Sequence, residues 1–151
     1  SILQEEGLWI PKQMSEPHTS LKQLEFPSDP TQLLEVDRFF EDLFERENLS
    51  EELHGNVSVS ISEAVNNAIL HGNKSDQSKL VRLNVNLDEN ELAIEVIDQG
   101  SGFDYDNLPD PTAPENLEKE TGRGIFIIRN LSDELEFEDE GRIMRMHFSL
   151  K

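Results

Sequence analysis

Residues 61–73 of the chain have the sequence ISEAVNNAILHGN, in which small apolar residues are mixed with an acid and several asparagines. The segment that begins at Ser50 fits two patterns, because residues 57–61 alternate as in a strand while apolar residues also recur at helical spacing. Its length favours a helix, for which Ser50 is a good N-cap and Gly72 a good C-terminal stop. The sequence therefore predicts a helix over residues 50–71.

Two polar residues in this helix are candidates for a functional site. Glu63 and Asn67 are four positions apart and face the same way, while Ala64 and Ala68 take the opposite, buried side. A carboxylate beside an amide oxygen suits a hard cation or an oriented water molecule. A solvated polar face explains the same pattern, so this motif by itself leaves both interpretations open.

A second motif, DQGSG at residues 98–102, directly follows an apolar run that ends at Ile97. An aspartate at the end of a buried strand can accept a hydrogen bond from an amino group. Gly100 and Gly102 would let the backbone approach a flat ligand closely. Aspartate and glycine are also the commonest turn residues, so a simple turn is the alternative interpretation.

A third motif, Thr121-Gly122-Arg123-Gly124, stands immediately before the apolar run at residues 125–128. Glycines at the start of a helix expose backbone N–H groups that can bind phosphate, aided by the positive end of the helix dipole. A junction between a loop and a helix would produce the same residues. The motif is weak alone, whereas the three motifs in this order and spacing are specific.

The remaining periodic segments predict the fold class. Alternating and apolar runs predict strands at 21–26, 80–87, 92–98, 135–137 and 143–150, and helical spacing predicts helices at 30–48 and 124–131. The residues at 88–90 predict a hairpin loop. Because strands and helices are grouped rather than alternating, we expect an α+β domain with helices on one face of a largely antiparallel sheet.

Two segments have no clear periodicity. Residues 1–17 are interpreted as an arm or an edge strand, which leaves a single domain over residues 18–151. Residues 103–121 form a long acidic stretch with several prolines, and a loop of this length inside a compact domain is usually functional or disordered.

The composition excludes some classes of binding partner. The chain has 13 Lys+Arg and 32 Asp+Glu, a formal net charge of −19, and a surface this negative repels nucleic-acid phosphates and anionic lipids. We therefore expect neither nucleic acid nor membrane as a partner. The absence of cysteine excludes disulfides and thiolate metal sites. No apolar stretch approaches the roughly 18 to 20 residues that span a bilayer, so a cytoplasmic protein is expected.

The three motifs resemble the N, G1 and G2 boxes of the Bergerat-fold ATPases, the superfamily of gyrase, Hsp90, histidine kinases and MutL. Over roughly residues 18–150 the chain is more closely similar to anti-sigma factor serine/threonine kinases of the sporulation and general-stress type. The resemblance implies a two-layer sandwich, with a mostly antiparallel mixed sheet and helices on one face. It also implies ATP and Mg²⁺ as ligands.

The resemblance implies a role for each motif residue. Glu63 matches the general base, Asn67 the Mg²⁺ ligand, and Asp98 the residue that accepts from the adenine amino group. Gly100 and Gly102 match the glycines that allow close approach to the nucleotide. The phosphate-binding segment is matched by Thr121, Gly122 and Gly124, and the ATP lid by residues 103–121. Arg123 and Lys74 are the cations nearest to the expected phosphates in the sequence, so we count them as candidates for phosphate contact.

The function implied by the resemblance is transfer of the γ-phosphate of Mg-ATP to a Ser or Thr of an antagonist protein. The same resemblance implies a sigma factor as a second partner, and a homodimer. The absence of the P-loop, H-R-D and D-F-G motifs excludes P-loop enzymes and eukaryotic-type protein kinases. Three alternatives stay open: a non-catalytic, ATP-gated protein-binding module, a detached histidine-kinase-type catalytic domain, and an acidic interaction domain that binds no nucleotide.

Overall fold

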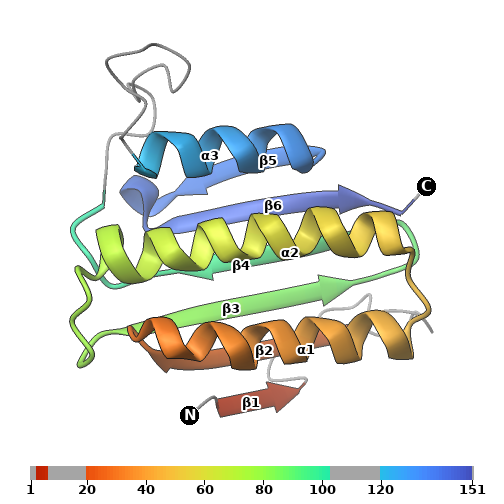
Figure 1. The fold of residues 1–151 in the computed structure, drawn as a ribbon, viewed down its shortest axis with the longest axis horizontal. Helices are drawn as coiled ribbons and strands as arrows, with labels where there is room; N and C mark the ends of the chain where they lie inside the picture. Colours follow the sequence, from red (N-terminus) through yellow and green to blue (C-terminus); the bar gives the residue numbers. More distant parts are fainter. Residues whose placement is uncertain (1–2, 7–19, 103–119, 151) are drawn as a thin grey trace.

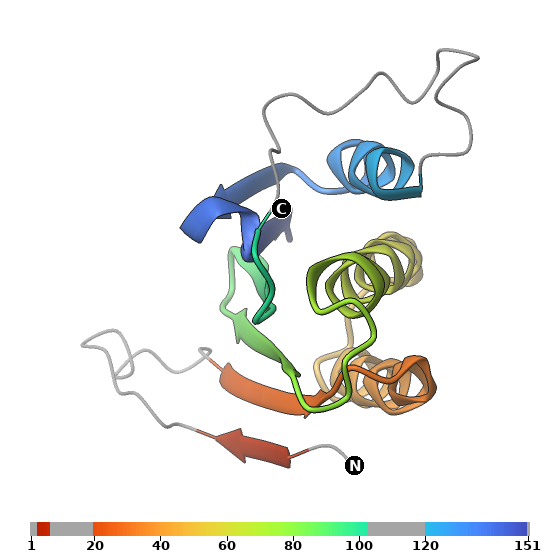
Figure 2. The ribbon, with the colours of Figure 1, turned by 90° about the vertical axis from the view of Figure 1, so that its left-hand side faces the viewer.

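The computed structural model describes residues 3–6, 20–102 and 120–150, which form two layers, with three helices against one face of a six-stranded sheet (Figures 1 and 2). The helices are α1 (Leu33–Arg46), α2 (Glu51–Asn66) and α3 (Glu120–Leu131). The strands are β1 (Leu3–Glu6), β2 (Ser20–Pro27), β3 (Leu80–Leu87), β4 (Glu91–Ile97), β5 (Glu134–Glu138) and β6 (Ile143–Ser149).

The sheet has the strand order β1-β2-β3-β4-β6-β5, and every pairing between the described strands is antiparallel. The predicted α+β sandwich with helices on one face is thus confirmed. β1 pairs with β2, with Leu3 opposite Glu25, and forms one edge of the sheet. The other residues of the segment predicted as an arm or edge strand, 1–2 and 7–17, lie outside the described part of the chain.

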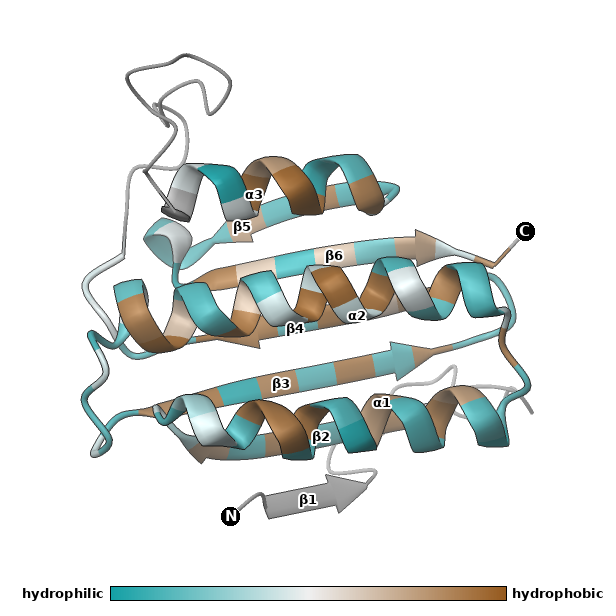
Figure 3. Ribbon diagram, viewed as in Figure 1, coloured by the Kyte–Doolittle hydropathy of each residue, from teal (hydrophilic) through white to brown (hydrophobic). Residues whose placement is uncertain are grey.

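The core lies between the sheet and the helices. Apolar and polar residues alternate along β3 (Figure 3), and every second residue of β4 is buried, so one face of each strand is apolar. In the observed register Leu83 is opposite Val96 and Val85 is opposite Ile94, and all four side chains are buried. The 88–90 loop predicted between these strands is confirmed. Asp88 Oδ1 accepts hydrogen bonds from the backbone N–H groups of Asn90 and Glu91.

The helical interpretation of the segment after Ser50 is confirmed. Ser50 Oγ accepts a hydrogen bond from the Leu53 N–H at 3.2 Å, as an N-cap does. Val57 and Ile61 are buried, whereas Val59 between them is 47% exposed. In a strand these three side chains would share one face, but on a helix Val59 turns away from the other two.

The structure corrects the boundaries of all three helices. The helix predicted over 30–48 divides into a 3₁₀ turn, Pro30–Gln32, and α1. The helix predicted over 50–71 divides into α2 and a π-helical turn, Asn67–Gly72, in which the Asn73 N–H donates to the Ala68 carbonyl. α3 begins at Glu120 rather than at residue 124. No helix in the described ranges combines the length and apolar character needed to cross a membrane.

Candidate functional site

The three motifs meet at one end of the helical layer. The C-terminal end of α2, the end of β4 and the beginning of α3 all lie at the same side of the domain, the left in Figure 1. Residues of α2 and its π-helical turn line a pocket of about 100 Å³ with residues from the ends of β4 and β6. We call this the Asp98 pocket; its lining residues are Ala64, Asn67, Ala68, His71, Gly72, Val96, Asp98, Gly102, Gly141 and Met144.

Asp98 is the acidic residue of this pocket, and two hydrogen bonds fix its position. Its backbone N–H donates to the Arg142 carbonyl at 3.0 Å, and its Oδ1 accepts from the Gly100 N–H at 2.8 Å. Burial raises the pKa of the Asp98 carboxyl above its ordinary value, while the Gly100 hydrogen bond and the nearby Arg142 act in the opposite direction. The pocket therefore presents an oriented acceptor in an apolar setting.

Glycines let the segments around Asp98 pack backbone to backbone. A Cβ on Gly72 would collide with the Asp98 carboxylate, and a Cβ on Gly100 would collide with the Gly72 carbonyl oxygen. Gly102 has φ +84°, and a Cβ there would meet the Glu140 carbonyl oxygen. Gly100 thus allows close contact within the protein, and its approach to a ligand stays a prediction. Gly102 also lines the pocket.

Asn67 joins the pocket to α3. A Cβ on Gly124 would lie 3.2 Å from Asn67 Nδ2, so this glycine allows the two helices to approach closely. Within the described residues Asn67 Nδ2 is buried without a hydrogen-bond partner, a state that costs about 1–3 kcal/mol in proteins. Its Oδ1 is the kind of oxygen that Mg²⁺ takes as a ligand, and the unpaired N–H is a donor for a phosphate oxygen. The residue therefore fits the Mg²⁺ ligand role that the resemblance implies for it.

Glu63 lies one turn before Asn67 and lines a different pocket. This second pocket is open, with a volume of about 450 Å³, and lies between α1 and α2. We call it the Glu63 pocket; it is lined by Asp37, Glu41, His54, Ser58, Val59, Ser62 and Glu63. The structure thus brings Asn67 and Asp98 together in one pocket but places Glu63 in the neighbouring one.

The phosphate-binding motif lies within the first turns of α3. Gly122 and Gly124 are buried and Arg123 is half-buried, so the prediction that these glycines precede the helix is wrong. The close approach of Gly124 to Asn67 explains why a helix tolerates glycine here despite its low propensity. The lid was predicted over residues 103–121, but its last two residues, Glu120 and Thr121, belong to α3. The Thr121 side chain and residues 103–119 lie outside the described part of the structure.

Lys74 follows the π-helical turn in a left-handed conformation, with φ +53°. Its side chain is exposed and is not among the residues that line the Asp98 pocket. Its contact with phosphate therefore stays a prediction.

Asn73 is a structural residue of the site that the sequence analysis did not assign. Its side chain is fully buried; Nδ2 donates to Ser28 Oγ at 2.8 Å and to the Leu80 carbonyl at 3.0 Å, and Oδ1 accepts from the Gln99 N–H at 2.7 Å. It therefore ties the residue after the π-helical turn to β3 and to the segments that follow β2 and β4. Its signal in the sequence was its place directly after the helix-stop Gly72.

Arg142 is a second unassigned residue, and it supports the loop that contains Asp98. Its Nε donates to the Gly100 carbonyl at 2.7 Å, and its Nη1 donates to the Asp139 carbonyl at 3.0 Å. Arg142 lies 44 positions after Asp98 in the numbering of the chain (142 − 98), so only the pairing of β4 with β6 brings the two together. No local pattern indicated this contact.

Comparison with known proteins gives matches over most of this domain. Residues 26–148 match the family model described as histidine kinase-like ATPase domain. An anti-sigma F factor of Clostridium beijerinckii is 33% identical over 87 residues, which is 56% of this chain and 60% of that relative. Proteins named serine-protein kinase RsbW from Bacillus cereus and Bacillus anthracis are 33% identical over 97 residues, 60% of this chain and 60% of each relative. The match therefore spans about 60% of the length of these curated relatives.

Proposed function

Because the chain belongs to the family of histidine kinase-like ATPase domains, we propose that it is an ATP-dependent protein serine/threonine kinase. In this proposal ATP binds at the Asp98 pocket, and its γ-phosphate is transferred to a Ser or Thr hydroxyl of a partner protein. The names of the relatives, serine-protein kinase RsbW and anti-sigma F factor, support the choice of acceptor and partner class.

The observation that carries the proposal is the oriented Asp98 carboxylate beside the unpaired amide of Asn67. The pocket, at about 100 Å³, is far smaller than the roughly 300–1,000 Å³ of sites that enclose a whole ligand. It therefore suits the base of the nucleotide, with Asp98 accepting from the exocyclic amino group. The phosphates would extend toward Asn67 and the N–H groups of the first turn of α3.

The residues of the chain would divide the work of phosphoryl transfer. Mg²⁺, held through Asn67 Oδ1, would neutralise phosphate charge. Gly122 would contribute a backbone N–H group, Gly124 would keep α3 close to Asn67, and Arg123 and Lys74 are the candidate cations. The acceptor oxygen attacks the γ-phosphorus in line, the bond to the ADP oxygen breaks, and Glu63 takes the hydroxyl proton.

The placement of Glu63 supports this division. The Glu63 pocket opens between α1 and α2, so an acceptor segment could reach the carboxylate without entering the Asp98 pocket. We propose that this acceptor belongs to an antagonist protein, and that the chain also binds a sigma factor and thereby regulates transcription. Homodimerisation and a cytoplasmic location, with neither nucleic acid nor membrane as a partner, complete the proposal.

The test is transfer of labelled γ-phosphate from Mg-ATP to candidate antagonist proteins. Replacing Glu63 with glutamine should slow transfer by about 10²- to 10⁴-fold, the range for loss of a general base. ATP affinity, measured by calorimetry, should stay unchanged. The matched control is Glu41→Gln, which removes a carboxylate from the same pocket but from α1, and should retain transfer.

A second candidate function follows from the separation of the two pockets. Since ATP binding at the Asp98 pocket would not require Glu63, the chain could act as a non-catalytic module in which ATP controls partner affinity. If both the wild-type chain and Glu63→Gln bind ATP but neither transfers phosphate to any candidate protein, this function would be favoured over the kinase. Absence of any ATP binding would exclude both.

A further inference from the structure

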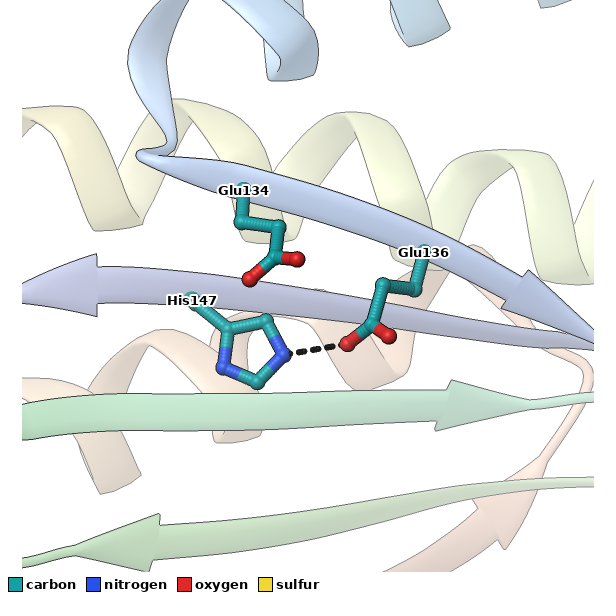
Figure 4. A group of neighbouring side chains, drawn as sticks. All are labelled: Glu134, Glu136 and His147. Carbon is teal, nitrogen blue, oxygen red and sulfur yellow. Dashed lines mark hydrogen bonds and ion pairs between the residues drawn. The ribbon is translucent and has the colours of Figure 1, made fainter.

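Three residues on the face of the sheet opposite the helices form a cluster of metal-ligand type. In the register of β5 with β6, Glu134 is opposite His147 and Leu135 is opposite Met146. Met146 points into the core and is fully buried, so its neighbour His147 points outward. Figure 4 shows Glu134 and Glu136 extending from β5 toward the imidazole ring of His147.

The three side chains place their ligand atoms close together. One ligand atom of each residue lies within 4.8 Å of those of the other two, and His147 Nε2 is 2.6 Å from Glu136 Oε1. Two ligands of one ion with bonds of about 2.1 Å can be at most about 4 Å apart. Small side-chain movements would therefore complete a coordination shell.

The hydrogen bonds of His147 require a proton or a metal ion between these groups. Its Nδ1 is 3.1 Å from Glu91 Oε1, while its Nε2 faces Glu136. A neutral imidazole donates from only one nitrogen, so it cannot donate to both carboxylates. Either a second proton or a metal ion must bridge one of these contacts.

The Glu91 contact has the geometry of a metal-binding histidine. Metal-binding histidines usually donate from the other ring nitrogen to a carboxylate, which fixes the tautomer and the ring orientation. A proton on Nδ1 shared with Glu91 would leave the Nε2 lone pair facing Glu134 and Glu136. The geometry around His147 is that carboxylate–histidine arrangement, with the carboxylate supplied by β4.

The surrounding charges leave the cluster negative. Arg145, a cation on this face, makes ion pairs with Glu95 and with Glu138 Oε1, the latter at 2.8 Å. Its guanidinium lies 3.9 Å from Glu136 Oε1, so it only partly offsets that carboxylate. Glu134 is exposed, so a divalent ion could enter from solvent and keep a water ligand.

We propose that Glu134, Glu136 and His147 bind a divalent transition-metal ion, with Zn²⁺ as the best match. Zn²⁺ takes imidazole nitrogen and carboxylate oxygen together, whereas Mg²⁺ and Ca²⁺ prefer oxygen ligands throughout. The site is separate from the Mg-ATP site and does not depend on the proposed kinase function. A bound ion would join the edge strand β5 to β6 and to Glu91 of β4.

The experiment is calorimetric titration of the tag-free, nucleotide-free chain with ZnCl₂, and with MgCl₂ for comparison. One Zn²⁺ per chain should bind and raise the melting temperature, because an ion that binds only the folded state stabilises it. Mg²⁺ should give no comparable binding. Absence of saturable Zn²⁺ binding would overturn the proposal and leave a shared proton as the bridging cation.

Substitutions in and around the cluster test whether Zn²⁺ binds there. His147→Ala should abolish it, and Glu91→Gln should weaken it by about 10- to 100-fold, as for other residues that orient a ligand. Glu134→Gln changes an exposed side chain, leaves folding intact and should also weaken binding. The control is His54→Ala, which removes a histidine from the Glu63 pocket and should keep full affinity. Equal Zn²⁺ affinity in wild type, His147→Ala and Glu134→Gln would place the ion elsewhere.

Discussion

The two pockets that flank α2 are built in different ways. The Asp98 pocket is small and formed where backbones meet, with Gly72, Gly100 and Gly102 allowing segments to approach within contact. The Glu63 pocket is larger and open, and is lined by side chains on the exposed sides of α1 and α2. Substitutions that add atoms where the backbones meet in the Asp98 pocket should therefore disturb the fold. Substitutions of the exposed side chains in the Glu63 pocket should leave the fold unchanged.

This difference matches the two tasks in the proposed reaction. A nucleotide is the same molecule in every cycle and is suited to a rigid pocket. A protein acceptor brings its own surface, which an open pocket with several carboxylates can meet. The comparison predicts that changes to the backbone contacts of the Asp98 pocket affect folding and ATP affinity together, and that changes in the Glu63 pocket leave ATP affinity unchanged.

The largest effect on stability is expected for Gly100→Ala. The added Cβ would collide with the Gly72 carbonyl oxygen, and two backbones cannot separate as easily as a flexible side chain can move. We expect a loss of about 3 kcal/mol in the free energy of unfolding, measured in urea, and loss of ATP binding. Gly55→Ala is the control, since a Cβ there meets nothing within 4 Å and alanine should stabilise α2 by about 0.5–1 kcal/mol.

The second largest effect on stability is expected for Asn73→Ala. This substitution tests whether the hydrogen bonds behind the Asp98 pocket also hold its backbone in place. Removal of the amide leaves the Gln99 N–H and the Leu80 carbonyl without their partner in a partly buried setting. We expect a loss of about 2–3 kcal/mol in unfolding free energy. Asn130→Ala on the exposed side of α3 should change it by less than about 0.5 kcal/mol. Equal effects of the two substitutions would contradict the proposed role of Asn73.

Asp98→Asn should separate ATP binding from folding. Because the Gly100 N–H donates to Oδ1, an asparagine would keep its oxygen there and turn its NH₂ toward the pocket. That NH₂ would face the amino group of adenine, and two hydrogen-bond donors cannot bond to each other. We expect ATP affinity to fall by about ten- to a hundredfold in calorimetry, the range for a hydrogen bond to a charged group. Unchanged affinity would show that the base binds elsewhere.

The same variant should alter the pH dependence of stability. Burial raises the pKa of Asp98 above 3.8, so the folded state holds this proton more tightly than the unfolded chain does. The contribution of Asp98 to stability therefore falls as pH rises from 3.8 through the raised pKa. Asp98→Asn should remove this fall and be at least as stable as wild type at neutral pH. Urea unfolding at a series of pH values measures the difference.

The smallest effect is expected in the Glu63 pocket. Burial, and then repulsion from Glu41, raise the pKa of Asp37, so its charge is slightly unfavourable. Because the side chain is largely solvated, Asp37→Asn should stabilise the fold by about 0.5 kcal/mol or less. ATP affinity should not change. A large loss of stability or of ATP binding here would mean that the two pockets are not independent.

The sequence indicated most of the secondary structure but erred where tertiary contacts set the boundaries. The helical period placed Val57 and Ile61 in the core, and the alternation in β3 and β4 gave the hairpin between them. The π-helical turn and the early start of α3 were missed. Both features lie where Asn67 meets Gly124, and no local pattern encodes a contact between segments so far apart.

The chain by itself determined which chemical groups are present and in which order. Glu63, Asn67 and Asp98 were identified from their residue types and spacing, since helical and strand periods are local properties of the chain. Only the tertiary structure placed Asn67 and Asp98 in one pocket and Glu63 in another. It alone brought Arg142 to the Asp98 loop and joined Glu134, Glu136 and His147, because these contacts depend on strand pairing between distant segments.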